Sequence, residues 1–237
     1  MPTKLRFKIH NWKLALLACV FIGLFTWLGC WQLSRASQKQ DLLQSFANRT
    51  TQEPVSAKNL NDVNDWRFYR AQLSGTFDNK HTFLLDNKTY KGKVGYEVYT
   101  PFHAHGMRSS ILVNRGFIPV GVGRQVLPNI QPIEGDVTLI GMINLPPTYM
   151  ALGKLIDPIK ITWPLRVEFI NLPDLANILK DKLFPYTLSM DPSDPRAYAI
   201  TWQVVSMAPE RHLGYAVQWF ALALTLLILF VALNRVK

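Results

Sequence analysis

The residue best placed to do chemistry is His212, which directly precedes a long apolar run near the C-terminus. It lies in the stretch PERHLGYAVQWFALALTLLILFVAL, residues 209–233. A neutral imidazole is a good metal ligand, and at a membrane edge it could bind a haem iron. The same side chain could instead be an interfacial anchor, because polar and aromatic residues gather where a membrane begins.

Two sets of side chains recur at helical spacing, one near the N-terminus and one near the C-terminus. They are Trp27, Trp31, Arg35 and Lys39 in one run, and His212, Tyr215 and Trp219 in the other. Each set occupies one slowly drifting helix face. Gln32 adds an amide, and Arg35 is a natural partner for a carboxylate such as a haem propionate. The residues therefore allow two interpretations, an aromatic belt with cationic caps or a shared pocket around a flat apolar ligand, and taken alone they favour the belt.

Two uncharged apolar runs must position these side chains. Residues 14–33 and 213–233 are each long enough for a transmembrane helix, which needs about 20 such residues. The first run exceeds the roughly 7–15 residues of a signal-peptide core, so we expect an uncleaved anchor. If the two helices run in opposite directions, His212 and residues 29–35 meet at the same membrane surface.

The charge distribution predicts the orientation of these helices. The net charge is +10, and six of the 26 basic residues flank the apolar runs at the chain ends: Lys4, Arg6, Lys8, Lys13, Arg235 and Lys237. The positive-inside rule then places the arm 1–13 and the tail 234–237 in the cytoplasm, and the domain 34–211 outside. That domain holds all 16 acidic residues and the other 20 basic ones, so the basic excess lies mainly at the ends. This pattern fits a membrane better than nucleic acid.

The N-terminal arm indicates which membrane the protein occupies. It is short and poor in serine, which is untypical of a mitochondrial transit peptide. We therefore expect the bacterial inner membrane rather than the mitochondrial inner membrane.

The outer domain carries little recognisable chemistry. The two cysteines, Cys19 and Cys30, both lie in the first apolar run, too far apart along one helix for a bridge. No nucleophile elbow, His-Glu-x-x-His motif or P-loop occurs. His103 and His105 could offer two metal ligands, but no acidic or cysteine partner is near them in sequence. The sequence therefore disfavours an enzyme, a thiol oxidoreductase or a thiolate copper carrier.

Short strand-like runs separated by turns dominate the outer domain. The predicted strands are 67–78, 81–87, 94–103, 109–120 and 136–146. A helix is expected within 170–183, and TLSM (187–190) and AITWQVVSM (199–207) are expected as closing strands. The predicted fold is a membrane protein in which a transmembrane helical hairpin flanks a β-rich α+β domain, with an antiparallel sheet or a partly closed barrel.

Four phrases in this order resemble a known family across almost the whole chain. They are GCWQLSR (29–35), GYEVYTPF (95–102), ILVNRGFIPV (111–120) and RHLGYAVQWF (211–220). Together they resemble the Surfeit-locus (Shy-type) family of cytochrome c oxidase assembly factors, which has the same two-helix layout.

The resemblance implies a non-enzymatic factor that builds haem-copper oxidases in the respiratory chain. It further implies a chaperone role: transient binding of haem a, with the iron on His212, and help with its insertion into the catalytic subunit. Trp31, Gln32, Arg35, Tyr215 and Trp219 would complete that site. The implied partners are the catalytic subunit, oxidase assembly intermediates and haem a biosynthetic enzymes. Two alternatives stay open, a haem-free scaffold for assembly intermediates and a membrane-anchored enzyme or sensor.

Overall fold

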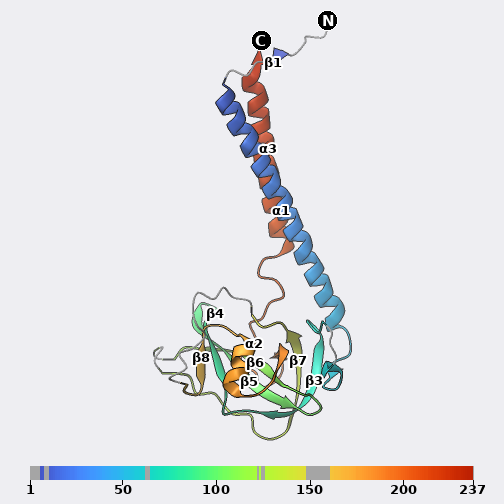
Figure 1. Ribbon diagram of the computed structural model, residues 1–237, viewed down its shortest axis with the longest axis vertical. Helices are drawn as coiled ribbons and strands as arrows, with labels where there is room; N and C mark the ends of the chain where they lie inside the picture. Colours follow the sequence, from blue (N-terminus) through green and yellow to red (C-terminus); the bar gives the residue numbers. More distant parts are fainter. Residues whose placement is uncertain are drawn as a thin grey trace. The chain divides into compact units, whose positions relative to one another are not determined.

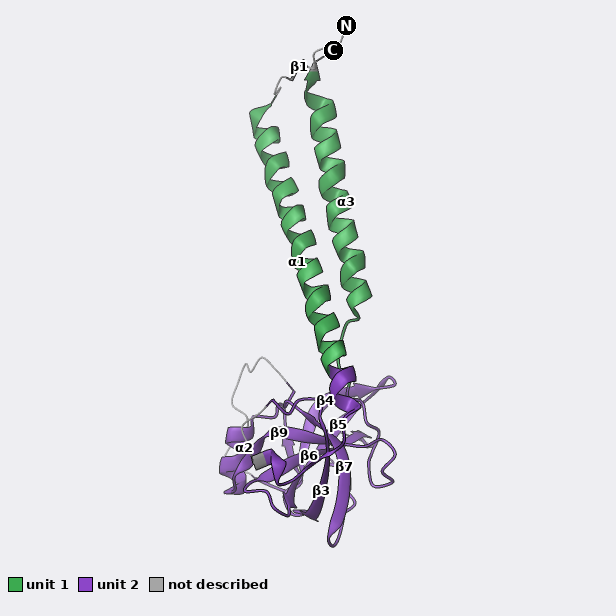
Figure 2. Cartoon of the chain, turned by 90° about the vertical axis from the view of Figure 1, so that its right-hand side faces the viewer, with its two compact units in different colours: residues 1–45, 203–237 green, residues 46–202 purple. Residues whose placement is uncertain are grey.

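The structure, a computed structural model, describes residues 6–7, 11–61, 65–121, 123, 126–147 and 161–236. The chain forms two compact units. One comprises Met1–Ser45 with Gln203–Lys237, and the other comprises Phe46–Trp202 (Figure 2). Each unit is described on its own below.

The first unit is a pair of long helices, α1 (Trp12–Thr50, of which the last turns belong to the second unit) and α3 (Pro209–Asn234) (Figure 1). Asn11 caps the start of α1, since its Oδ1 accepts a hydrogen bond from the backbone N–H of Lys13 at 3.0 Å. Proline opens α3, where a missing N–H costs nothing. Both helices are long and apolar enough to cross a membrane, and they contain the predicted spans 14–33 and 213–233. Helix α1 continues well beyond the first of these spans, to Thr50.

A short antiparallel ladder joins the chain ends beyond these helices. Strand β1 (Arg6–Phe7) pairs with β10 (Arg235–Val236), so that Phe7 lies opposite Arg235.

The second unit is built on a closed five-stranded barrel. Its strands are β3 (Arg70–Phe77), β5 (Lys93–Ala104), β6 (Ser110–Pro119), β7 (Val137–Asn144) and β9 (Leu183–Met190). The barrel closes because β3 pairs with β7 along most of its length and with β5 at its end. One pairing, β6 with β9, is parallel. The fold class is confirmed: two apolar helices flank a β-rich domain whose barrel is fully closed.

Further elements extend and cover this barrel. Strand β4 (Phe83–Tyr90) pairs with β5, β8 (Leu165–Val167) pairs with β4, and β2 (Val55–Ser56) pairs with the start of β3. A 3₁₀ turn (Asn59–Asn61) and the helix α2 (Leu172–Leu179) complete the unit. Asn171 caps α2, accepting a hydrogen bond from the N–H of Asp174.

The burial pattern of the strands follows from these layers. Strand β3 alternates buried and exposed residues, as expected when one face meets a core and the other meets solvent. Most of β5 and β6 is buried on both faces. Phe102 and Ile111 belong to the main barrel core, whereas Tyr99 and Leu112 pack in a second core with β8 and α2. This second layer explains why β5 and β6 are buried on both faces.

The expected strands are confirmed with small shifts at their ends, with one exception. The predicted closing strand 199–207 is wrong: within it, Ala199 makes an isolated bridge to Phe117, and the rest has no strand. The physical reason is that β6 already pairs with β5 and β9. Only the short end of β6 that β9 leaves open could accept a further partner.

Candidate functional site

Small residues bring α1 and α3 together on one face of each helix. On α1, Gly29 and Ala36 are buried, seven residues apart. On α3, His212, Ala216 and Ala223 are buried. A Cβ added at Gly29 would lie 2.7 Å from the Phe220 ring, so this glycine allows the two backbones to approach. Close contact at small residues is the usual way in which transmembrane helices pack.

His212 and Gln32 form a direct hydrogen bond across this helix pair. His212 Nδ1 lies 2.7 Å from Gln32 Oε1, and the histidine is only 9% exposed. Because an amide oxygen only accepts, this pairing puts a proton on Nδ1, and in the neutral tautomer Nε2 keeps its lone pair. Among the described residues Gln32 is the one hydrogen-bond partner of the ring. A histidine whose second nitrogen is held by a carbonyl in this way has the arrangement common to metal-binding imidazoles.

The other predicted site residues take no part in this hydrogen bond. Trp219 stacks on Phe25 of α1, with ring centroids 5.7 Å apart. Trp31 and Tyr215 are each 46% exposed, and Arg35 is exposed with its guanidinium carbon 6.0 Å from the Trp31 ring centroid. Arg35 also donates to Gln38 at 2.9 Å. The structure therefore brings Gln32, not Trp31 or Arg35, onto the face that contacts His212.

These residues match a haem in three respects: a possible iron ligand, exposed aromatic rings and a cation for a carboxylate. In its neutral tautomer, held by Gln32, His212 offers Nε2 as a possible ligand of the iron. Trp31 and Tyr215 present uncovered rings, and Arg35 presents a cation that could pair with a carboxylate. Sequence reasoning missed Phe25 and the Gly29–Phe220 contact. The signal that could have found them is the spacing of Gly29 and Ala36 on either side of Gln32.

The VNRG phrase of the outer domain builds a β-bulge around a buried arginine. The register between β5 and β6 shifts at Arg115, and Gly116 takes a φ of +105° that favours glycine. Asn114 Oδ1 accepts a hydrogen bond from the Gly116 N–H at 2.8 Å. Arg115, 2% exposed, lies with its guanidinium carbon 5.8 Å from the Phe77 ring centroid and 5.3 Å from that of Tyr198.

Arg115 has no acidic partner among the described residues. Its Nη2 donates to the Gln131 carbonyl at 2.8 Å, and its Nε has no hydrogen-bond partner. Burial lowers the pKa of this guanidinium, since it disfavours the charged form. Its burial removes it from any partner's reach and assigns it to the barrel's packing.

A second buried polar network ties the chain after β9 to the sheet. Glu97 accepts hydrogen bonds from Tyr99 Oη at 3.1 Å and from Thr201 Oγ1 at 3.0 Å. Asn114 in turn donates to Tyr99 Oη. Burial, with the Glu97 charge beside it, raises the pKa of Tyr99 well above its ordinary value. The hydroxyl therefore stays protonated and acts as a structural donor.

His103 and His105 point to separate partners. His103 Nδ1 lies 2.8 Å from Ser110 Oγ, which donates to Asp181, whereas His105 Nε2 lies 3.0 Å from Asp136. The described part of the chain holds no group of three or more metal-binding side chains. These histidines thus serve as hydrogen-bonded surface residues.

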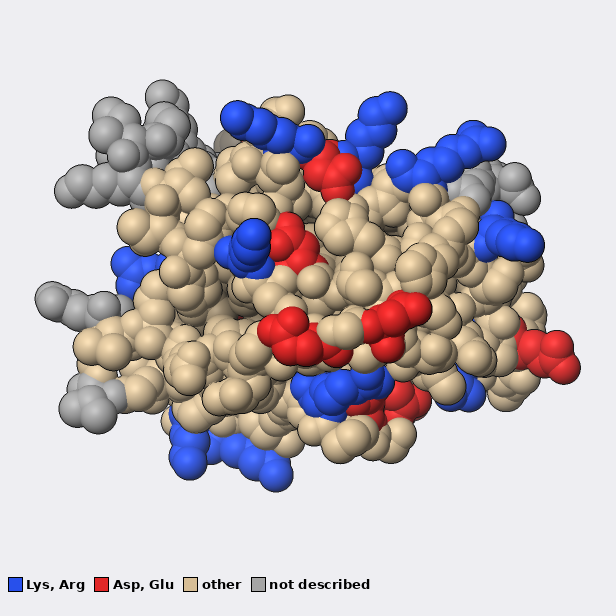
Figure 3. Space-filling model, turned by 90° about the horizontal axis from the view of Figure 1, so that it is seen from below, with Lys and Arg blue, Asp and Glu red and all other residues tan. Residues whose placement is uncertain are grey.

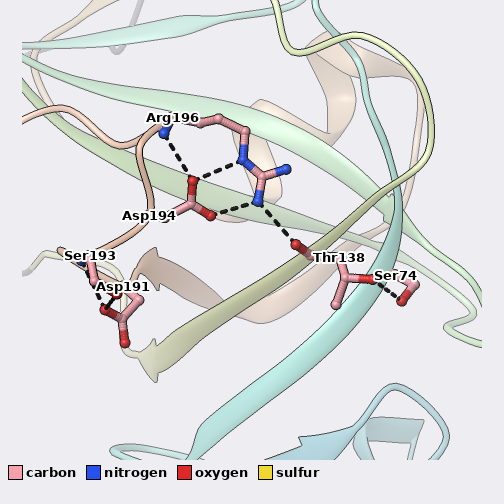
Figure 4. A network of polar contacts seen from close by, with 6 residues as sticks. All are labelled: Ser74, Thr138, Asp191, Ser193, Asp194 and Arg196. Atoms are coloured by element: carbon pink, nitrogen blue, oxygen red, sulfur yellow. Dashed lines mark hydrogen bonds and ion pairs between the residues drawn. The ribbon is translucent and has the colours of Figure 1, made fainter.

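Surface charge on the face in Figure 3 is mixed, with basic and acidic side chains interspersed. Figure 4 shows one polar network of the second unit at close range. Arg196 donates to both carboxylate oxygens of Asp194, at 2.8 and 2.6 Å, and to the Thr138 carbonyl at 3.0 Å. The hydrogen bonds from Arg196 lower the pKa of Asp194. A mixed surface of this kind lacks the single-sign field of a nucleic-acid groove.

Comparison with known proteins agrees with this architecture. The sequence pattern of the SURF1 family matches residues 19–224. A SURF1-like protein of Monosiga brevicollis is 24% identical over 235 residues, covering 94% of this chain and 87% of its own length. Surfeit locus protein 1 of Homo sapiens is 27% identical over 234 residues, covering 90% of this chain and 73% of its own. Cytochrome oxidase assembly protein SHY1 of Saccharomyces cerevisiae is 26% identical over 95 residues, covering 39% of this chain and 24% of its own. The chain belongs to the SURF1 family.

Proposed function

We propose that this protein is a membrane-bound assembly factor for cytochrome c oxidase that binds haem a through His212. The general role in oxidase assembly rests on the family and on the name of the yeast relative. The haem proposal rests on one observation, the hydrogen bond of 2.7 Å between His212 Nδ1 and Gln32 Oε1. That bond prepares Nε2 as a ligand at the outer end of two apolar helices.

Each residue of the site has a separate task in this proposal. Gln32 holds the proton on Nδ1 and orients the ring. His212 would hold the group through Nε2, and haem a would supply the iron. Trp31, Tyr215 and Trp219 would offer aromatic surface to a flat apolar group, and Arg35 would pair with a propionate.

The location suits a carrier of an apolar cofactor. Haem a carries a long isoprenoid tail, so its release into water is unfavourable and a carrier should hold it at the bilayer edge. A single histidine also permits release more easily than two strong ligands. The protein would then act without catalysis, at the periplasmic side of the bacterial inner membrane. Its partners would be the oxidase catalytic subunit, assembly intermediates and the enzymes that make haem a.

An optical spectrum tests the haem proposal. The full chain, co-expressed with haem a biosynthetic enzymes and purified, should show a Soret band. His212→Ala should abolish or strongly shift it, and Gln32→Leu should lower haem affinity by about 10- to 100-fold. Trp31→Phe and Arg35→Ala should weaken binding without abolishing it.

The matched control is His103→Ala, which removes an exposed histidine of the outer domain. It should leave the spectrum unchanged. A full, unshifted haem a spectrum in His212→Ala would show that the ligand assignment is wrong. If the protein co-purifies with oxidase subunits but never with haem, the haem-free scaffold is the better account.

A further inference from the structure

The end of the helix pair that carries both chain termini contains a second site, far from His212. An apolar groove of about 340 Å³ lies there between α1 and α3. This volume is within the roughly 300–1,000 Å³ of typical small-molecule sites. The apolar walls come from both helices, mainly from Ala15, Ala18, Phe21, Leu226, Leu229 and Phe230.

Polar side chains line the mouth of this groove. Asn11 and Asn234 belong to its lining; Asn11 directly precedes α1 and Asn234 is the last residue of α3. Asn234 is buried and donates to the Phe230 carbonyl at 2.8 Å. The groove is therefore apolar along the helices and polar where they end.

Positive charge gathers next to this mouth. Lys13 follows Asn11 by two residues and Arg235 follows Asn234 directly, and both side chains are exposed. The ladder between β1 and β10 also brings the backbone of Arg6 beside this end, opposite Val236. The described residues nearest to the mouth include no acid that would neutralise these cations.

We propose that this groove binds an anionic phospholipid, with an acyl chain between α1 and α3 and the phosphate at Lys13 and Arg235. Apolar walls match the chain, and the cations match the headgroup charge. Basic pockets between transmembrane helices are a recurring type of anionic lipid site. The site is distinct from that of His212, which lies in the first turn of α3 and contacts Gln32 in the middle of α1.

Native mass spectrometry of the full chain tests this assignment. The protein is reconstituted in vesicles of equimolar phosphatidylglycerol and phosphatidylcholine and then extracted in a mild detergent. We expect one retained phospholipid, with a preference for phosphatidylglycerol. Lys13→Gln with Arg235→Gln should reduce that preference by roughly fivefold per cation. Both side chains are exposed and neither lines the groove, so the two changes leave its apolar walls intact.

Filling the groove gives an independent test. Ala18→Phe should abolish retention of both lipids, whereas Val20→Phe, on an exposed position of α1 outside the groove, should retain them. Retention by Ala18→Phe equal to that of the unaltered protein, or no preference for the anionic lipid, would overturn the proposal. A second result would also overturn the proposal. It is a disulfide-linked dimer formed by Ala18→Cys, made together with Cys19→Ser and Cys30→Ser, in protein that retains no lipid. That result would assign the groove to a second copy of the chain.

Discussion

At the scale of single residues, the side chain proposed to bind a ligand differs in its surroundings from one that holds the outer domain together. Among the described residues His212 has one hydrogen-bond partner, Gln32, whereas Arg115 is enclosed by two aromatic rings. Both residues lie in the phrases that define the family resemblance. Only the first belongs to the proposed haem site.

Arg115 should therefore matter for stability rather than for partner contact. Arg115→Ala removes a large buried side chain, and we expect it to cost about 2–4 kcal/mol of unfolding free energy. Arg115→Met should cost less, since an apolar side chain of similar length refills the space around a charge that has no carboxylate. Thermal unfolding of the purified chain and its abundance in membranes measure the effect. Impaired oxidase assembly with unchanged stability would contradict this and point to a partner.

Asp194 should give the outer domain an acid-sensitive contact. Its folded-state pKa is lowered by Arg196, so its contribution is complete above the unfolded pKa of about 3.9. The contribution is lost as pH falls below that value and through the lower folded pKa. Asp194→Asn should cost on the order of 1 kcal/mol at neutral pH and less in acid.

Unfolding midpoints measured between pH 3 and 7 test this sign. Glu134→Gln, at an exposed carboxylate, is the control and should leave the profile unchanged. If Asp194→Asn lowers stability equally at every pH, the ion pair with Arg196 does not carry the effect.

At the scale of elements, one glycine determines how closely α1 and α3 pack. Gly29 faces the Phe220 ring, and a larger residue there must displace it. Gly29→Val should cost about 1–3 kcal/mol through overpacking. Because the crowded atoms are at the end of one side chain, Phe220→Ala should recover part of that loss.

A double-mutant cycle on the unfolding free energy measures this coupling. We expect an interaction term of about 0.5–3 kcal/mol. Gly23→Val is the matched control, because a Cβ at Gly23 meets nothing within 4 Å. Additive effects of the two changes would show that Gly29 and Phe220 do not share the contact.

At the scale of the whole molecule, the basic ends predict that both termini lie in the cytoplasm with the β-rich domain outside. Reporter fusions after Asn61 and after Lys237 should therefore report opposite sides of the membrane. Both reporters on the same side would show that one of the two helices does not cross. This test is independent of haem and of lipid binding.

Local patterns in the sequence were enough to predict the helices and most strands. Uncharged runs of membrane-spanning length mark α1 and α3, because the bilayer fixes the required length. Turn residues between apolar runs mark β3 to β7, since strand periodicity is a property of neighbouring residues. The candidate ligand His212 was also recognisable, from its position at the end of an apolar run.

Tertiary structure alone decided how these parts meet. The parallel pairing of β6 with β9 and the closure of β3 onto β5 join residues far apart in the chain, and no local period encodes them. The contact face of α1 was equally hidden. A helix that is apolar on all sides shows no hydrophobic stripe, so the aromatic spacing suggested Trp31 while the small residues Gly29 and Ala36 placed Gln32 against His212. The face of α1 that contacts α3 is therefore determined by the close packing of the two backbones and not by hydrophobicity.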